Sequence, residues 1–370
     1  MSEEFQDKTI SRHAAYEEVK TTLSDYWSGR MKPLKTTIPY LDHNLLGGMR
    51  WGSIGMILAL SGHGKTHLKE QLLADLTNPT LNPGCEKYVI FDANWEMLVL
   101  NLAIRRAAIE LNIKRRSIWN GDLSDAQKKA IFDIIDREQK KAGWYQQESL
   151  AAEDWYRQVR QKLINLEEGQ QLINIIDHIA LVKDNGDKKQ MMDLLVERSK
   201  DLKLEFPTKI ITIILSQLNR KIEERTDPRY LAPQKGDVYG SDTMYQICDW
   251  VLALHQPWKL NHDKYMVLPG PLNGENRNSD QYEHLIEHMT DPTLKLTNLE
   301  TYGRLYYHYL KIREEEDSVT IACEVILPAL KEELRQNRQV PQHQSQSRDI
   351  AALKAKAMAK YGEDGVDIFD

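Results

Sequence analysis

Residues 53–76 read SIGMILALSGHGKTHLKEQLLADL and decide the fold class. An apolar run leads into a loop with two glycines, and the loop leads into a helical pattern, so the expected order is strand, loop, helix. Gly62 and Gly64 allow backbone N–H groups to curl around phosphate oxygens, and the following helix N-terminus favours an anion. The segment ALSGHGKT (59–66) fits the phosphate-loop pattern GxxxxGK followed by Ser or Thr, except that Ala59 replaces the first glycine. A chance GKT turn before a helix is the alternative.

This loop predicts a site for a nucleoside triphosphate and Mg²⁺. Lys65 would neutralise the β and γ oxygens, and Thr66 would ligate the metal ion. We expect ATP as the nucleotide, although nothing in the sequence distinguishes it from another triphosphate. The residues expected to bind the nucleotide are Ser61, Gly62, His63, Gly64, Lys65, Thr66 and His67.

Short apolar runs alternate with longer helical patterns through the central part of the chain. The runs are SIGMILAL, KYVIFDA, LINIIDHIALV, KIITIILS, DWVLALH, LYYHYLKI and VTIACEVI. Alternation of this kind indicates an α/β fold with a mainly parallel, twisted sheet flanked by crossover helices.

The chain divides into a core and two flanking segments. We expect a linker helix within residues 1–32, the core over 33–330, and a mobile tail over 331–370 that ends in the acidic GEDGVDIFD. Two polar stretches, 115–170 and 258–303, interrupt the alternation and are interpreted as insertions, of which the first is helical in pattern. Its expected packing anchors are Trp119, Trp144 and Trp155.

The linker helix is expected within residues 11–29. Ala15, Val19, Leu23 and Trp27 are spaced four apart and therefore share one face. That face would pack either on a neighbouring subunit or on the core of its own chain.

Composition sets outer limits on function. The chain has 370 residues, of which 41% are hydrophobic, enough for a substantial core. No apolar run approaches the roughly 20 residues that span a bilayer, and MSEEFQDKT lacks the apolar stretch of a signal peptide, so we expect a cytoplasmic protein with no membrane partner. The three cysteines lack CxxC spacing, which argues against a zinc ribbon. The net charge is −6, so a nucleic-acid surface would have to be a local basic patch.

Hydrolysis needs further acidic residues at the ends of neighbouring strands. Asp177 follows the apolar run LINII and is expected to hold the metal ion with Thr66. A base or water-orienting group should end the strand after the phosphate helix, where Asp92, Asn94 and Glu96 stand, and we favour Glu96. Its alternative role is to begin the next helix, where an acid suits the dipole.

A series of segments resembles the DnaB-like family of hexameric helicases, including phage replicative helicases. The segments are PLKTTIPYLDHNLLGGMRWGSI (33–54), FDANWEM (91–97) with Arg105 downstream, IIDHIALV (175–182), ILSQLNRKIEERTDPR (214–229), GSDTMYQICDWVLALH (240–255) and YLKIREEED (309–317). The resemblance implies a RecA-like P-loop NTPase core and catalysis by Glu96, Lys65, Gln217, Lys311 and Arg313. Asp242 departs from the family pattern, which usually has glycine there.

The same resemblance implies how the site would work. Gln217 would sense the γ-phosphate, and the pair Lys311 and Arg313 would reach the γ-phosphate bound by the neighbouring subunit. The protein would then be a homo-oligomer, expected to be a hexamer, that hydrolyses ATP and moves along single-stranded DNA. The residues expected to contact DNA lie in two loops and are Lys183, Lys188, Lys189, Arg220, Arg225, Arg229 and Lys235.

The expected function is an ATP-dependent replicative DNA helicase that unwinds duplex DNA in the cytoplasm of a bacterial cell, or of the host if the chain is phage-encoded. A primase, a polymerase or a loader is an expected further partner. Two alternatives remain: a RecA-fold ATPase that does not translocate, such as a KaiC-like ring or a recombination mediator, and a hydrolysis-deficient loader or scaffold ring. The Lys-x-Arg pair and the SQLNR segment favour the helicase.

Overall fold

The computed structural model describes residues 11–38, 41–184, 186–226, 231–240, 242–260, 262, 304–313 and 319–324. The tail expected over 331–370 and most of the stretch 258–303 lie outside these residues.

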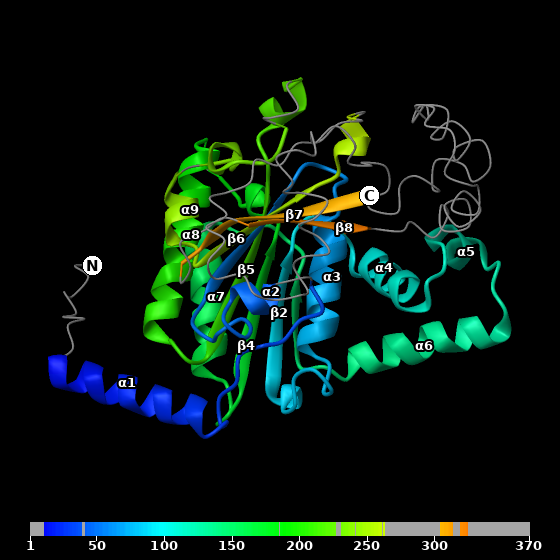
Figure 1. Ribbon diagram of the computed structural model, residues 1–370. Coiled ribbons are helices and arrows are strands. Elements are labelled where there is room, and N and C mark those ends of the chain that lie inside the picture. The colour runs from blue at the N-terminus through cyan, green and yellow to red at the C-terminus, as the bar shows by residue number, and fades with distance from the viewer. Residues whose placement is uncertain are drawn as a thin grey trace, which may run out of the picture.

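An eight-stranded sheet forms the centre of the molecule, with the strand order β3-β2-β4-β5-β1-β6-β7-β8 (Figure 1). The six strands from β3 to β6 run parallel, and β7 and β8 are added antiparallel beyond β6. The strands are β1 (Ile54–Ala59), β2 (Tyr88–Asn94), β3 (Gly143–Gln146), β4 (Gln171–Asp177), β5 (Ile210–Gln217), β6 (Trp250–His255), β7 (Arg304–Ile312) and β8 (Val319–Glu324). The expected mainly parallel α/β sheet is confirmed, and all seven expected apolar runs form strands.

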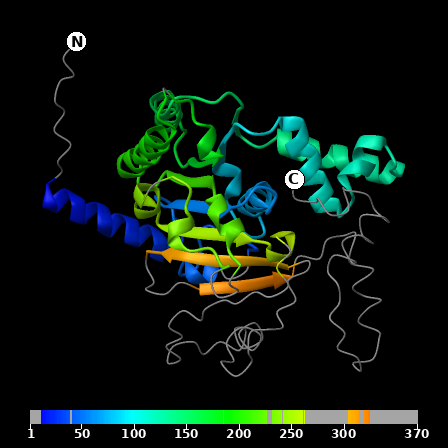
Figure 2. The same ribbon diagram turned by 90° about the horizontal axis from the view of Figure 1, so that it is seen from above.

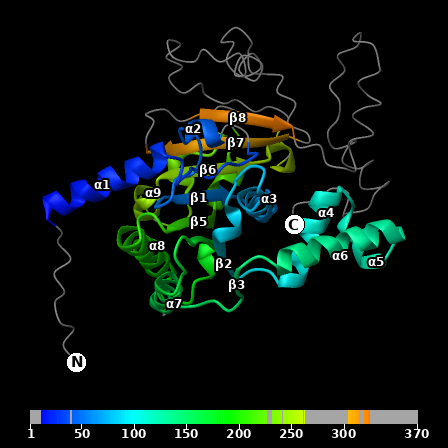
Figure 3. The same cartoon turned by 90° about the horizontal axis from the view of Figure 1, so that it is seen from below.

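Helices cover both faces of this sheet, which Figure 3 shows from below. Leu68, Leu72 and Leu76 of α3 pack on one face, and Trp155 of α7 and Leu195 of α8 pack on the other. Because the central strands are covered on both faces, they read as continuous apolar runs and not as alternating ones.

The described helices are α1 (Arg12–Trp27), α2 (Leu41–Asn44), α3 (Lys65–Leu76), α4 (Val99–Leu111), α5 (Arg115–Asn120), α6 (Asp125–Gln139), α7 (Ala152–Ile164), α8 (Lys188–Glu205) and α9 (Asp242–Ile247), with 3-10 turns η1 (Cys85–Lys87), η2 (Ile179–Leu181), η3 (Arg220–Glu224), η5 (Lys235–Asp237) and η6 (Pro257–Leu260).

The stretch 115–170 is not a single insertion. Helices α5 and α6 project from the body with α4, whereas β3 extends the sheet and α7 packs on the main core (Figure 2). Of the three tryptophans expected to anchor this stretch, Trp155 is fully buried, but Trp144 and Trp119 are 41% and 58% exposed. The polar composition arises because β3 is an edge strand and α7 exposes its outer face.

Helix α1 begins at a Ser11 cap, whose hydroxyl accepts a hydrogen bond from the Ala14 backbone N–H, and it buries none of its residues. It extends away from the body on the side opposite to α4, α5 and α6 (Figure 2). Trp27 is 81% exposed, so the face shared with Val19 and Leu23 is not covered by this chain's own core. None of the described helices is long and apolar enough to cross a membrane.

A glycine within β1 sets the packing of the sheet centre. Gly55 is paired with Trp250 of β6, and a Cβ atom at position 55 would lie 1.9 Å from the Trp250 ring. We predict that Gly55→Ala lowers the free energy of unfolding by about 1–3 kcal/mol or more, because the buried indole cannot move aside without repacking the core.

Chemical denaturation measures this difference. The matched control is Gly236→Ala, since a Cβ there meets no atom within 4 Å, and a surface change of that kind is expected to stay within about 0.5 kcal/mol. Equal stability of the two variants would contradict the packing argument.

Candidate nucleotide site

The loop after β1 has the geometry of a phosphate cradle. Gly62 and Gly64 have φ values of 72° and 100°, in the left-handed region that glycine adopts without steric cost. Lys65 opens α3, is almost fully buried, and donates a hydrogen bond from Nζ to the Ala59 carbonyl oxygen at 3.3 Å. The N-terminus of α3 therefore points its free N–H groups at the place where a phosphate would lie.

A cavity of about 500 Å³ opens over this loop. That volume lies in the range of small-molecule sites. It is lined by Ser61, Gly62, Gly64, Lys65, Thr66, Glu96, Met97, Asn101, Ile104, Arg105, Arg115, Trp119 and Gln217. Five of the seven residues expected to bind nucleotide are therefore brought together with Glu96 and Gln217.

The two histidines expected at the nucleotide do not line the cavity. His63 is buried, accepts a hydrogen bond at Nδ1 from the Gln256 backbone N–H, and stacks on His255 with ring centroids 5.6 Å apart. Burial lowers the pKa of His63 to about 3 and that of His67 to about 4. Both imidazoles are thus neutral near pH 7, and His63 supports the loop from behind.

Among the three polar candidates at the end of β2 and just beyond it, Glu96 is the one at the cavity. Asp92 is fully buried, and Asn94 is hydrogen-bonded to the backbone of Met97. Burial and the neighbouring Asp177 raise the pKa of Glu96. A raised pKa brings a carboxylate closer to the value that suits a general base near neutral pH.

Asp177 ends β4 and is fully buried beside α3. Neither of its carboxylate oxygens accepts a hydrogen bond from any residue within the described part of the chain. Its charge is balanced by the ammonium group of Lys69, which lies 3.2 Å from Oδ2. Lys69 stands one helical turn after Lys65, so both ammonium groups come from the same face of α3.

Lys69 is the centre of a buried ion cluster. Its Nζ is 3.2 Å from Asp92 Oδ2 and 3.5 Å from Glu70 Oε1, in addition to the contact with Asp177. Burial alone would lower the pKa of Lys69, but the combined charges of the three carboxylates outweigh it and raise the pKa. Burial raises the pKa of Asp92 to about 6.

A second cation extends the cluster toward the projecting helices. Arg106 of α4 pairs with Glu70 of α3 and with Glu138 of α6, and Lys141 lies 2.6 Å from the same Glu138 carboxylate. The phosphate helix is therefore tied to α4 and α6 by buried charge, which fixes the wall of the cavity opposite the loop.

Gln217, the last residue of β5, also lines the cavity. Its carbonyl oxygen accepts a hydrogen bond from the Tyr239 N–H at 3.1 Å. The Asn219 N–H donates to the Asp237 carbonyl oxygen at 2.7 Å, and Leu218 and Val238 form a bridge between the same two segments. The end of β5 and the loop beyond it are thus joined by backbone hydrogen bonds.

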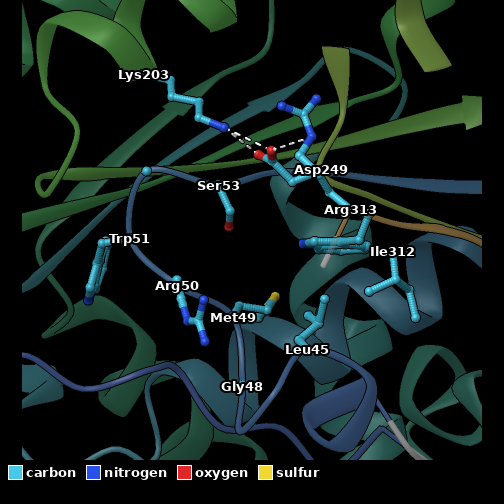
Figure 4. Close-up of a pocket in the computed structure, with 12 residues that line it drawn as sticks. Leu45, Gly48, Met49, Arg50, Trp51, Ser53, Lys203, Asp249, Ile312 and Arg313 are labelled. Carbon is cyan, nitrogen blue, oxygen red and sulfur yellow. Dashed lines mark hydrogen bonds and ion pairs between the residues drawn. The ribbon is translucent and has the colours of Figure 1, made fainter. Parts of the chain in front are cut away.

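Lys311 and Arg313 lie at the other end of the sheet. Arg313 lines a second cavity, of about 190 Å³, with Asp249 and the residues that precede β1 (Figure 4). Its Nε is 3.3 Å from Asp249 Oδ1, and Asp249 Oδ2 accepts a hydrogen bond from the Ile54 N–H, where β1 begins. The phosphate loop follows the opposite end of this six-residue strand, roughly 20 Å away. Arg313 therefore does not contribute to the cavity of its own subunit.

The described residues expected at DNA follow the adjacent strands β4 and β5. Lys183 lies in the loop after β4, Lys188 and Lys189 begin α8, and Arg220, Arg225 and Lys235 lie in the segment after β5. Lys183, Lys189, Arg220 and Lys235 are exposed. Lys188 is 2.9 Å from Asp184, and Arg225 is ion-paired with Asp237. These two side chains therefore pair with acidic residues of their own segments. Arg229 lies outside the described residues.

The residues around Thr66 and Asp177 fit Mg²⁺. Both side chains offer hard oxygen donors, and the carboxylate of Asp177 keeps its lone pairs free of hydrogen-bond donors within the described chain. No group of three or more His, Cys, Asp or Glu residues suited to a metal occurs among the residues that the structure describes.

Several residues at or behind this cavity were not predicted as site residues. Lys69 stands behind the cavity, and the lining adds Met97, Asn101, Ile104, Arg105, Arg115 and Trp119. The available signal for Lys69 was its spacing of four from Lys65, which places both lysines on the same face of the helix. Nothing local marked Asn101 or Trp119, because their role depends on how α4 and α5 fold back over the loop.

The strand order and the phosphate loop define a P-loop nucleotide-binding domain of the RecA-like class. The profile of the DnaB-like helicase C terminal domain matches residues 33–284. The chain belongs to this family.

Comparison of structures gives the same fold. A solved structure described as an ATPase domain matches with a TM-score of 0.60 at 15% identity, over 86% of this chain and 96% of that one. A DnaB-like replicative helicase, whose structure is described together with its interactions with primase, matches with a TM-score of 0.59 at 16% identity over 87% of this chain. This chain spans 65% of the length of that helicase. No curated protein sequence matches.

The ion cluster yields a stability prediction. Lys69→Met would leave Asp92, Asp177 and Glu70 without their shared cation in a buried site, and breaking a buried ion pair costs about 3–5 kcal/mol. We therefore expect the free energy of unfolding, measured in urea, to fall by about that amount.

The double variant Lys69→Met/Asp92→Asn removes one charge of each sign and should recover part of the loss. If the single variant is as stable as the wild type, or the double variant is less stable than the single one, Lys69 does not balance these carboxylates.

Proposed function

We propose that this chain is the ATP-hydrolysing core of a ring-forming replicative helicase, which moves along single-stranded DNA and unwinds duplex DNA. The observation that carries the proposal is the separation of two half-sites. A phosphate loop, Glu96 and Asp177 stand at one end of the sheet, and Lys311 and Arg313 stand at the other. Each half would complete the other only between neighbouring subunits.

Within one subunit, each residue at the cavity has a role that follows from its chemistry. Lys65 neutralises the β and γ oxygens of ATP, and Gln217 contacts the γ-phosphate. Glu96 accepts the proton of the attacking water. Thr66 and Asp177 would hold Mg²⁺, which when bound withdraws charge from the phosphate oxygens.

Lys311 of β7 and Arg313, which follows the strand, act in trans. Lys311 donates hydrogen bonds from Nζ to the carbonyl oxygens of Tyr245 and Gln246 in α9, at 2.7 and 2.8 Å. Arg313 also donates a hydrogen bond to the Gln246 carbonyl oxygen, at the end of α9. Together they form a compact cationic tip. Placed against the next subunit's cavity, this tip stabilises the charge that develops on the γ-phosphate, as arginine residues supplied by a partner do.

DNA would be bound by the segments that follow β4 and β5, through Lys183, Lys189 at the start of α8, Arg220 and Lys235. These exposed cations would grip phosphates without reading bases. Gln217 and the second loop are joined by backbone hydrogen bonds, which gives the bound nucleotide a direct route to the loop.

The wider setting follows the family. The proposed assembly is a hexamer in the cytoplasm of a bacterial cell, or of the host if the chain is phage-encoded. A primase is the first partner to test, because one similar helicase is described in its interactions with primase. A polymerase or a loader would act with the same ring.

A RecA-fold ATPase that does not translocate is the second candidate, because it would use the same Lys65, Glu96 and Asp177. The Lys311 and Arg313 pair at the far end of the sheet favours the helicase. Hydrolysis that does not respond to DNA would favour the second candidate, and an absence of hydrolysis would favour a scaffold ring.

ATP hydrolysis should be stimulated by single-stranded DNA and fall by about 10³ or more in Arg313→Ala, because that variant loses the cation supplied in trans. Lys65→Ala should be equally inactive. Mixing the two inactive proteins should restore part of the activity, since a mixed interface joins an intact loop to an intact Arg313.

Lys203→Ala is the matched control, because Lys203 shares Asp249 with Arg313 but has no proposed contact with phosphate. It should hydrolyse ATP at close to the wild-type rate. Failure of the mixture to recover activity would rule out action in trans, and inactivity of Lys203→Ala would mean that Arg313 acts only through Asp249.

DNA binding should be salt-dependent and indifferent to sequence. Each phosphate contact on a single strand contributes about 0.7 to the slope of log K against log salt, so Lys189→Ala/Lys235→Ala should lower the slope by about 1.4. Fluorescence anisotropy with labelled oligonucleotides of two unrelated sequences measures it. Lys128→Ala, on the outer face of α6, should leave the slope unchanged. An unchanged slope in the double variant would move the DNA surface elsewhere.

A further inference from the structure

The cavity over the phosphate loop continues well past the phosphate region. Beyond Lys65 and Thr66 its wall is formed by helices α4 and α5, through Asn101, Ile104, Arg105, Arg115 and Trp119. With about 500 Å³, the cavity has room for more than a triphosphate tail. The part of a nucleotide that is not phosphate has to lie along this wall or leave the cavity.

The opposite side of the loop is closed within the described residues. His63 is buried against His255, and Lys259 donates a hydrogen bond from Nζ to the Gly62 carbonyl oxygen at 2.5 Å. A nucleoside attached to phosphates in the loop therefore extends toward α4 and α5.

Trp119 lies at the edge of the unit formed by α4, α5 and α6, and its side chain is not buried in that unit. Its neighbour Ile118 packs on the small core shared by α4 and α6, formed around Ala107, Ile131 and Ile134. Trp119 itself remains 58% exposed and faces the cavity. The turn after α5 keeps it there, because Gly121 adopts φ 73° and the Asp122 N–H donates to the Ser117 carbonyl oxygen at 3.0 Å.

We propose that α4 and α5 form a nucleobase subsite, in which a purine base stacks on the indole of Trp119 and the amide of Asn101 hydrogen-bonds the base edge. This inference rests on the proposed nucleotide function. It names the base as the part of the nucleotide that α4 and α5 would recognise. An aromatic ring offers a flat apolar platform to any base. An asparagine amide can donate to and accept from adenine together, which gives a preference for adenine over guanine. Ile104 lines the same part of the cavity.

The rigid mounting of this wall supports the assignment. Arg106, within the same helix as Asn101 and Ile104, is ion-paired with Glu70 of the phosphate helix and with Glu138 of α6. The loop that would hold the phosphates and the helix that would hold the base are thus fixed relative to each other before a ligand arrives, which limits the ordering cost of binding.

Calorimetric titration of the full chain with ATP and with inorganic tripolyphosphate, both with Mg²⁺, separates base binding by α4 and α5 from phosphate binding by the loop. Loss of one stacked base costs roughly 1–3 kcal/mol, which corresponds to about 5- to 150-fold in affinity. We expect Trp119→Ala to lose ATP affinity by that factor and to bind tripolyphosphate as the wild type does. Trp119→Phe should recover most of the ATP affinity, because it restores a flat ring.

Trp144→Ala is the matched control. Trp144 is also a partly exposed tryptophan but lies on the edge strand β3, outside this cavity, so its removal should change neither affinity.

Asn101→Ala should bind ATP and GTP about equally, whereas the wild type should prefer ATP.

The outcomes distinguish the subsite from the nucleotide function itself. If Trp119→Ala binds ATP with wild-type affinity while Lys65→Ala binds neither ligand, the subsite is wrong and the phosphate site stands. If Asn101→Ala keeps the preference for ATP, the amide does not read the base. If the wild type binds neither ATP nor tripolyphosphate, the proposed function fails and the subsite fails with it.

Discussion

The buried ammonium group of Lys69 is the interaction on which the arrangement of the nucleotide site depends. Through Asp92 it contacts β2, and through Asp177 it contacts β4, while its own backbone belongs to the phosphate helix. One cation therefore fixes the distance between the helix that presents Lys65 and the strand that presents Asp177. The position of the phosphate loop relative to Asp177 thus follows from this contact.

The topology then separates the parts of the site. Because β1, β2, β4 and β5 are parallel, their carboxyl ends lie at the same end of the sheet, and the loop, Glu96, Asp177 and Gln217 converge there. Strand β7 is antiparallel to β6, so its last residues lie at the opposite end of the sheet, where Arg313 meets Asp249. No rotamer of Arg313 spans a strand length, since a side chain reaches far less than roughly 20 Å. If Arg313 acts on a nucleotide as proposed, that nucleotide is bound by a neighbouring subunit.

The sequence predicted those features that depend on local pattern. Seven strands were visible as apolar runs because burial on both faces removes the alternation of polar residues, and the phosphate loop was visible because strand, glycines and helix are consecutive. Features built from distant residues were missed. Strand β3 is four exposed or half-buried residues, GWYQ, held at the sheet edge by pairing with β2 and by a hydrogen bond from Trp95 to Gln146. In the sequence, Lys69 resembles a surface lysine, because its carboxylate partners come from the distant strands β2 and β4. Trp119 resembles a core residue in the sequence, and only the fold shows that α5 places it at the cavity.

Tyr245 of α9 joins the two proposed working surfaces. Lys235, in the loop after β5, lies 5.0 Å from the centroid of the Tyr245 ring, and Lys311 lies 5.1 Å from the same centroid. Lys311 also donates a hydrogen bond to the Tyr245 carbonyl oxygen, while the Tyr245 hydroxyl donates to the Leu310 carbonyl oxygen at 2.6 Å. Both ammonium groups therefore lie against the same aromatic ring, so the loop after β5 and the end of β7 share one contact residue. In the proposed mechanism this contact couples a subunit's grip on DNA to the charge it presents to its neighbour's nucleotide, with no element that has to unfold between them.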